Sequence, residues 1–239
     1  MSGVRIPPGP FTVYDRFIPQ ACLGILFRLV EFMTLVRVRQ HVNPLSQKYL
    51  VATAPPNWQE IFAKPEQPLH LDIGCARGLF LLEMAAQQPD WNFLGVEIRQ
   101  PLVDRANQDR DQQQLTNLHY LFCNINTSLR TLLAPQSVQA VTIQFPDPWF
   151  KRRHQKRRVV QPELVEALAV CLKPGGWILV QSDVLEVAEE MCDRISENPA
   201  FSRQDQNWLP ENPLPIPTER ESTTLEQGMP VYRSQFQRR

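Results

Sequence analysis

Short apolar runs alternate with longer stretches of helical character along most of this chain. The runs are rich in β-branched and aromatic residues, as buried strands are, and they cover 69–74, 91–96, 118–123, 138–143 and 177–181. The stretches between and after them predict helices at 79–87, 100–113, 162–172 and 185–196. Strands and helices in alternation predict an α/β fold in which a parallel sheet carries helices on both faces.

The first 36 residues do not follow this alternation. Residues 1–20 are rich in Pro and Gly, and the apolar run at 21–32 is too short and too charged to cross a membrane. That run lacks the features of a signal peptide, although an amphipathic helix is compatible with it. Residues 2–8 resemble a translated tRNA gene, which favours Met33 as the start of translation. We therefore expect residues 1–36 to be an N-terminal extension that is disordered or not translated.

Residues 37–239 are expected to form one domain. They are numerous enough to bury a full core, and a short helix at 58–62 precedes the first predicted strand. Weaker strand patterns at 200–204 and 231–237 flank a Pro-rich loop at 210–217. The sequence leaves open whether the protein is a monomer or a homodimer.

Composition narrows the class of protein only in part. Lys and Arg together number 25, as do Asp and Glu, so the net charge of zero says nothing about partners. The five cysteines form no C-x-x-C pair, which argues against a disulfide framework and a zinc site and favours a reducing cytoplasm. The four histidines show no ligand spacing, so we predict no bound metal.

The stretch 144–150, which reads QFPDPWF, follows the fourth predicted strand. Asp147 lies between Pro146 and Pro148, and because proline restricts both itself and the residue before it, this segment should be stiff. The carboxyl ends of parallel strands are where α/β proteins bind their ligands.

A basic segment, defined here as residues 151–158, continues that stretch. Six of its eight residues are Lys or Arg, and they are accompanied by a histidine: Lys151, Arg152, Arg153, His154, Lys156, Arg157 and Arg158. Such a segment next to a rigid acid and aromatic residues favours a contact with nucleic acid. A solvated turn before the next helix is the plainer alternative.

The first three strand ends suggest a nucleoside-binding site. Gly74 and Gly78 flank the first turn, where the absence of Cβ atoms lets a ligand approach the backbone. Glu97 follows Gly78 by 19 residues and ends the second strand, where an acid accepts hydrogen bonds from ribose. Asp72 would repel a pyrophosphate but attract a cation, so S-adenosylmethionine fits better than a dinucleotide. Tight packing alone is another reason for a Gly-rich turn.

The sequence resembles the bacterial tRNA (guanine-N7)-methyltransferase family from about Arg37 to the C-terminus. The motifs that carry the resemblance are LHLDIGCARG at 69–78, GVEIR at 95–99, IQFPDPWFKRRHQKRR at 143–158, Gln181-Ser182-Asp183 and Thr218-x-x-Glu221. The resemblance implies a Rossmann-like class I methyltransferase fold with a mostly parallel seven-stranded sheet. It also implies transfer of a methyl group from S-adenosylmethionine to N7 of guanine 46 in the variable loop of tRNA.

The resemblance and the strand-end pattern together give a set of expected site residues. For the cofactor these are Asp72, Gly74, Gly78, Glu97, Asn124 and Asp147. For the tRNA substrate they are Lys151, Arg153, His154, Lys156, Arg157, Arg158, Asp183, Thr218 and Glu221. Asp147 takes the position of the family's catalytic aspartate, while Asn124 and Ala76 stand where the family often has Asp and Gly. Asp183 and Glu221 could instead be helix caps or solvated acids.

The chemistry of the implied substrate sets what such a site has to do. N7 of guanine has an in-plane lone pair and no proton, so no general base is needed, and alignment with the methyl donor becomes the main requirement. Three other classes stay open at this point. The first is a methyltransferase for an exocyclic amine or a protein side chain, and the second is a non-catalytic tRNA-binding module. The third is an NAD oxidoreductase, which is disfavoured because this sequence lacks the G-x-G-x-x-G turn of that class.

Overall fold

The computed structural model describes residues 42–239, which lie in one compact unit, Val38–Arg239. The expectations for residues 1–36, including a start at Met33 and an amphipathic helix at 21–32, lie outside the described residues. No helix within residues 42–239 is both long and apolar enough to cross a membrane.

Within the described range, seven strands form one sheet in the order β3-β2-β1-β4-β5-β7-β6. The strands are β1 Leu69–Ile73, β2 Asn92–Glu97, β3 Leu118–Phe122, β4 Val138–Gln144, β5 Leu172–Ser182, β6 Phe201–Arg203 and β7 Tyr232–Arg238. β1 to β5 pair in parallel, whereas β7 runs antiparallel to both β5 and β6. The expected seven-stranded, mostly parallel sheet is therefore confirmed.

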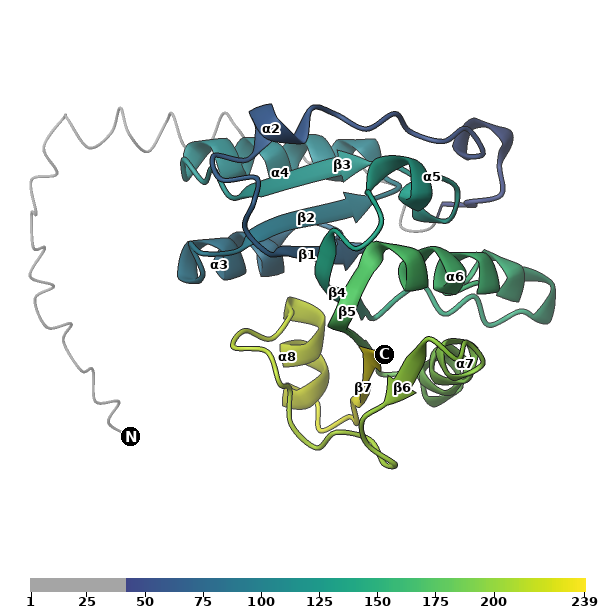
Figure 1. The fold of residues 1–239 in the computed structure, drawn as a ribbon. Coiled ribbons are helices and arrows are strands. Elements are labelled where there is room, and N and C mark those ends of the chain that lie inside the picture. Colours follow the sequence, from purple (N-terminus) through teal and green to yellow (C-terminus); the bar gives the residue numbers. More distant parts are fainter. Residues whose placement is uncertain (1–41) are drawn as a thin grey trace, which may run out of the picture. The chain divides into compact units, whose positions relative to one another are not determined.

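The helices cover both faces of this sheet (Figure 1). They are α2 Trp58–Ile61, α3 Leu79–Gln87, α4 Gln100–Gln112, α5 Ile125–Leu132, α6 Pro162–Cys171, α7 Leu185–Ser196 and α8 Glu219–Glu226, with 3-10 turns η1 Gln47–Tyr49 and η2 Arg152–Arg157. Two buried clusters result. One joins α5, α6 and α7 to the sheet, and the other joins α3 and α4 to its opposite face.

Alternation along the strands explains why the two clusters are separate. In β1, Leu71 and Ile73 belong to the first cluster, while the intervening His70 and Asp72 point to the other face. Neighbouring residues of β2 also point to opposite faces, since Phe93 belongs to the second cluster and Leu94 to the first. Because both faces are apolar, the strands read as nearly continuous hydrophobic runs in the sequence.

The structure differs from the predicted elements in three places. The helices α5 and α8 were not predicted, although Asn124 and Thr218 each cap one of them with a side-chain oxygen. β5 begins at Leu172 rather than at Trp177, because Leu172 pairs with Val138 and a register shift then absorbs the residues before Trp177. The Lys-Pro-Gly-Gly sequence at 173–176 follows the end of α6 at Cys171 and lies in this shifted part of β5.

Candidate functional site: a pocket at the carboxyl ends of the parallel strands

A pocket of about 610 Å³ opens where β1, β2, β4 and β5 end. Its walls come from the turn after β1, the end of β2, the start of α5, the loop 145–150 and the start of α8. Most of the expected site residues line it: Asp72, Gly74, Gly78, Glu97, Asn124, Asp147, Arg157, Asp183 and Thr218. The topology thus brings together residues that are up to 146 positions apart in the sequence, from Asp72 to Thr218.

The turn after β1 has the backbone geometry that its glycines predicted. Gly74 has a φ of 84°, and no atom lies within 4 Å of where its Cβ would be, so the backbone is open to the pocket there. Gly78 has a φ of 75°, and a Cβ would meet the ring of Tyr120 at 2.5 Å. The hydroxyl of Tyr120 donates to the carbonyl of Gly78 at 2.6 Å. Ala76 has a φ of 49° without being glycine, a conformation that costs energy.

Glu97 is 4% exposed at the end of β2 and is the most heavily hydrogen-bonded acid of the turn. Its carboxylate accepts from the backbone N–H of Ala76 at 3.1 Å and from that of Arg99 at 3.0 Å. The Arg99 side chain donates twice more, each time at 2.9 Å, and this bonding raises the pKa of Arg99. Arg99 also lines the pocket, and sequence reasoning had given it no role.

Asp72 is a buried carboxylate, 4% exposed, on the face of β1 that meets the pocket. It accepts a hydrogen bond from the Thr142 hydroxyl at 2.6 Å and a longer one from Gln144 at 3.4 Å. No Lys or Arg within residues 42–239 forms an ion pair with it. Burial raises the pKa of Asp72 to about 6, against the effect of these two hydrogen bonds. Thr142 and Gln144 were not predicted as site residues, because only the pairing of β1 with β4 brings them close to Asp72.

Asn124 performs a structural task as well as lining the pocket. Its side-chain NH₂ donates to the carbonyls of Pro44 and Tyr49, each at 3.2 Å, and its oxygen accepts from the N–H of Asn126 at 3.2 Å. The amide thereby caps α5 and holds the segment before η1 at the edge of the pocket. An Asp here would have no NH₂ group to hold those two carbonyls.

The loop 145–150 carries Asp147 to the mouth of the pocket. Phe145 and Trp149 have φ angles of 48° and 43°, so the chain turns sharply on either side of the Pro-Asp-Pro segment. The Trp149 ring is enclosed by Arg157, whose guanidinium carbon lies 5.0 Å from the ring centre, and by the His154 ring at 5.7 Å. Phe150 also lines the pocket and is 67% exposed.

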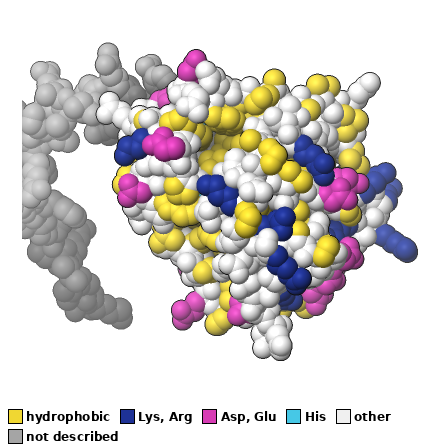
Figure 2. Space-filling view, viewed as in Figure 1, with side chains coloured by type: hydrophobic (Ala, Val, Ile, Leu, Met, Phe, Trp, Pro, Cys, Tyr) yellow, Lys and Arg dark blue, Asp and Glu magenta, His cyan; other side chains and the backbone are white. Residues whose placement is uncertain are grey.

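The basic segment is not uniform. Lys151, Arg152, Arg153 and Lys156 are exposed, and His154 and Arg157 are half-buried against Trp149. Loss of water around the His154 ring and the positive charges of Arg157, Arg153 and Lys151 lower its pKa. Figure 2 shows Lys and Arg interspersed with acidic side chains over one face of the molecule, in keeping with its zero net charge.

Two of the predicted substrate residues, Arg158 and Glu221, are buried and form ion pairs. Arg158 is 5% exposed and pairs with Glu186 and Glu190, so it is not available to a tRNA phosphate. Glu221 is 1% exposed, is absent from the pocket lining and forms an ion pair with Arg233 at 2.7 Å. The partners lie 12 to 32 residues away in the chain, which is why counting charges along the sequence could not find them.

Asp183 and Thr218 do line the pocket. Asp183 forms an ion pair with the exposed Arg220 of α8, and Thr218 accepts from the N–H of Glu221 at 3.1 Å as the cap of the same helix. A further pair joins Arg77 of the glycine turn to Glu219 at 2.6 Å. Two ion pairs thus join α8 to the strand-end loops beside the pocket. No group of three His, Cys, Asp or Glu side chains within the described residues could hold a metal ion.

Comparisons with known proteins agree with this architecture. The family described as "Putative methyltransferase" matches residues 66–234. The tRNA (guanine-N(7)-)-methyltransferase of Trichormus variabilis is 60% identical over 210 residues, covering 86% of this chain and 98% of that protein. The enzyme of the same name from Synechococcus elongatus is 59% identical over 207 residues, covering 85% and 97%.

Solved structures show a similar fold at low identity. The 16S rRNA methyltransferase KamB matches with a TM-score of 0.57 at 17% identity, covering 78% of this chain and 95% of that one. The geranyl diphosphate C-methyltransferase of Streptomyces coelicolor A3(2) matches with a TM-score of 0.50 at 15% identity, covering 80% and 76%. These two likenesses concern the fold alone.

The sheet order with its single reversed strand, and a glycine turn and acids at the parallel strand ends, define a class I S-adenosylmethionine-dependent methyltransferase. Within that class, the chain belongs to the tRNA (guanine-N7)-methyltransferase family. The predicted fold class and family are confirmed.

Proposed function

We propose that this protein transfers the methyl group of S-adenosylmethionine to N7 of guanine 46 in the variable loop of tRNA, forming 7-methylguanosine. The observation that carries the proposal is the position of Asp147, which lines one pocket together with the glycine turn and Glu97 and lies on the loop that leads into the basic segment. The names of relatives about 60% identical over most of the chain support the same reaction.

The pocket fits this cofactor. Its volume of about 610 Å³ is in the range of roughly 300–1,000 Å³ that small-molecule sites have. Glu97 is suited to accept hydrogen bonds from ribose hydroxyls, and the open backbone at Gly74 leaves room for a ligand against the turn. Asp72, a buried acid without a cation from residues 42–239, is suited to a positively charged amino group. When bound, S-adenosylmethionine supplies an electrophilic methyl group.

The protein's part in the reaction is to hold guanine in line with that methyl group. The N7 lone pair needs no deprotonation, so the role left to the carboxylate of Asp147 is to orient the base through its N1–H and N2–H donors. Methylation leaves positive charge on the purine, which a fixed carboxylate stabilises. Phe150, 67% exposed at the pocket mouth, offers a ring on which an unpaired base can stack. The exposed cations of the basic segment are suited to bind tRNA phosphates.

Identification of the product tests the proposal. Unmodified tRNA is incubated with the protein and S-adenosylmethionine, digested to nucleosides and analysed by mass spectrometry with chromatographic standards. We expect 7-methylguanosine as the new nucleoside. A methylated exocyclic amine, such as N2-methylguanosine, would assign the protein another reaction of the same fold.

Cofactor affinity should depend on pH through Asp72. Its pKa of about 6 means that the carboxyl group takes up a proton as the pH falls below that value, and a neutral acid no longer attracts the cofactor's amino group. We expect the affinity to fall by up to about tenfold for each pH unit below 6 and protons to be released on binding near pH 6. Calorimetry in two buffers of different ionisation enthalpy measures both effects. Asp72→Asn should bind more weakly with a flatter pH profile; an unchanged profile in this variant would remove Asp72 from the amino-group site.

Replacing Glu97 by Ala should weaken cofactor binding by about 1.5–3 kcal/mol, the scale expected for loss of a charged hydrogen-bond acceptor. Titration calorimetry gives this difference directly. Glu163→Ala, which removes an exposed acid from α6, is the matched control and should bind as the wild type does. Equal affinity in the two variants would mean that Glu97 only holds Arg99 and the turn.

A further inference from the structure

The Pro146-Asp147-Pro148 segment contains two prolines, which limit the backbone hydrogen bonds that it can donate. Neither proline has an N–H group, and the last ladder bond of β4 is donated by the N–H of Phe145 to the carbonyl of Gln181 at 2.8 Å. Beyond that bond, the chain turns through left-handed conformations at Phe145 and Trp149. Groups that bind the carbonyl oxygens of the segment therefore help to hold its position.

Arg158 is such a group. Its Nε donates to the carbonyl of Pro148 at 2.8 Å, its Nη2 to Oε1 of Glu186 at 2.8 Å, and its Nη1 to Glu190. Burial opposes the charge, but the bonds with Glu186 and Glu190 raise the pKa of Arg158, so it stays protonated. One planar guanidinium thus joins the loop to α7 from three of its donors, in a fixed planar geometry that the tetrahedral donors of an ammonium group do not match.

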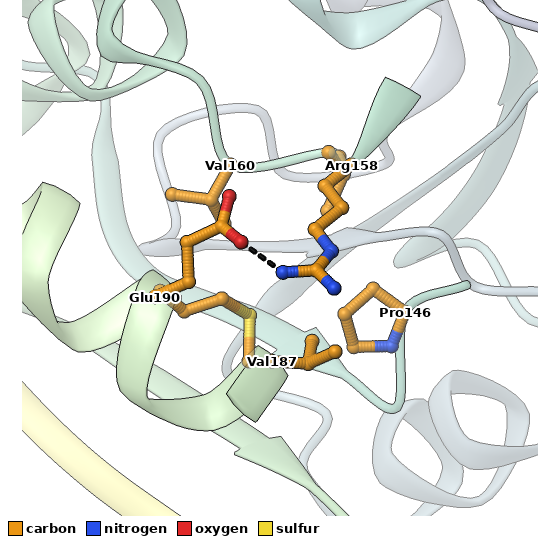
Figure 3. A pocket seen from close by; sticks show the side chains of 7 residues that line it. Pro146, Arg158, Val160, Val187 and Glu190 are labelled. Carbon is orange, nitrogen blue, oxygen red and sulfur yellow. Dashed lines mark hydrogen bonds and ion pairs between the residues drawn. The ribbon is translucent and has the colours of Figure 1, made fainter. Parts of the chain in front are cut away.

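Helix α7 provides a firm base for this contact. Glu186 and Glu190 are four residues apart and lie on one face of the helix. Figure 3 shows Arg158 and Glu190 facing each other, with Pro146 and Val187 close by. The cavity among these side chains measures only about 10 Å³, close to the smallest volume that holds one water molecule. The loop therefore has little room to move toward α7.

We infer that Arg158 is a positioning residue for methyl transfer: through the Pro148 carbonyl it fixes the loop that carries Asp147 at the mouth of the cofactor pocket. This inference rests on the proposed function, in which Asp147 orients the guanine. The physical reason for an effect on rate is that a displacement of about 1 Å in a reacting pair can cost about 100-fold. Arg158 acts on the reaction through the loop and touches no substrate.

The test compares Arg158→Lys with Arg194→Lys. Arg194 is a matched control because it also pairs with Glu190 and donates to a backbone carbonyl, that of Val160, without contacting the loop. Both lysines keep a positive charge beside α7, but lysine has no Nε–H with which to hold Pro148 in the same plane. We expect Arg158→Lys to slow single-turnover methyl transfer about 10-fold to 100-fold, with the control within about twofold of wild type. Cofactor affinity and Tm should be equal in the two variants.

Two results of this comparison would overturn the inference. One is equal single-turnover rates in Arg158→Lys and Arg194→Lys; the other is a loss of cofactor affinity in Arg158→Lys that accounts for its slower rate.

Glu186→Gln is a milder second variant, since Glu186 is 58% exposed and its replacement leaves Arg158 paired with Glu190. It should slow the reaction by about threefold to tenfold without a change in cofactor affinity; a rate equal to wild type would also count against the inference. Nucleoside analysis of the wild-type product is a separate experiment. A methylated nucleoside other than 7-methylguanosine would refute the proposed function, while the ratio of the single-turnover rates of Arg158→Lys and Arg194→Lys would still decide the role of Arg158.

Discussion

Replacing Asp147 by Ala is expected to lower the rate of methyl transfer roughly 100-fold to 1,000-fold, with cofactor affinity unchanged within about twofold. The reason lies in where the side chain is held. Asp147 lines the pocket at the end of β4, on a loop fixed by the Phe145 ladder bond on one side and by Arg158 on the other. Removing its carboxylate takes away both the acceptor for the guanine donors and the charge that stabilises the methylated purine.

Single-turnover rates with tRNA and calorimetry with the cofactor measure the two halves of this prediction. Asp147→Asn is a useful companion variant, because it keeps one acceptor oxygen but loses the charge. A rate between those of wild type and Asp147→Ala would apportion the effect between orientation and charge. Loss of cofactor binding in Asp147→Ala would contradict the prediction and assign the side chain to the cofactor.

Removing the exposed cations of the basic segment is expected to weaken tRNA binding and to flatten its dependence on salt. The variant replaces Arg152, Arg153 and Lys156 by Gln, since these side chains are exposed. If each contacts a phosphate, the slope of log K against log salt falls by about 0.7–0.9 per residue. Arg157 and Arg158 are left in place, because the first packs on Trp149 and the second is buried.

Fluorescence anisotropy of labelled tRNA over a range of salt concentrations provides the slope. A matched control replaces three exposed cations elsewhere, Lys64, Arg105 and Arg130, by Gln and so removes the same charge. The control should keep the wild-type slope. Equal slopes in the two triple variants would show that the basic segment is a solvated turn and that tRNA binds on another surface.

The periodicity of the sequence was sufficient for the parallel part of the sheet. The runs that became β1, β2 and β4 are almost entirely buried, so their apolar character was easy to recognise, and the edge strand β3 is apolar although only partly buried. The positions of Gly74, Glu97 and Asp147 at strand ends followed from the same pattern, because parallel strands bring their carboxyl ends to one edge. β7 was predicted only weakly, since Tyr232–Arg238 is largely polar and its packing depends on the distant β5.

Contacts between distant segments limited the prediction of the site. Arg158 and Glu221 looked like solvent-exposed charges because each partner comes from another element: α7 for Arg158 and β7 for Glu221. The Thr218-x-x-Glu221 motif has the form of a helix capping box, but the Thr218 side chain caps α8, whereas the Glu221 carboxylate pairs with Arg233. Thr142 and Gln144 carried no signal of their own, as only strand pairing brings them to Asp72.

The most direct test of the central claim is the position of the methyl group on tRNA. Borohydride reduction followed by aniline cleaves the chain at 7-methylguanosine, so sequencing the fragments locates the modified base. The proposed function predicts cleavage at guanine 46 after treatment with the wild-type protein and none when that guanine is replaced by adenine. Cleavage at another guanine, or methyl incorporation that persists undiminished in the replaced tRNA, would contradict it.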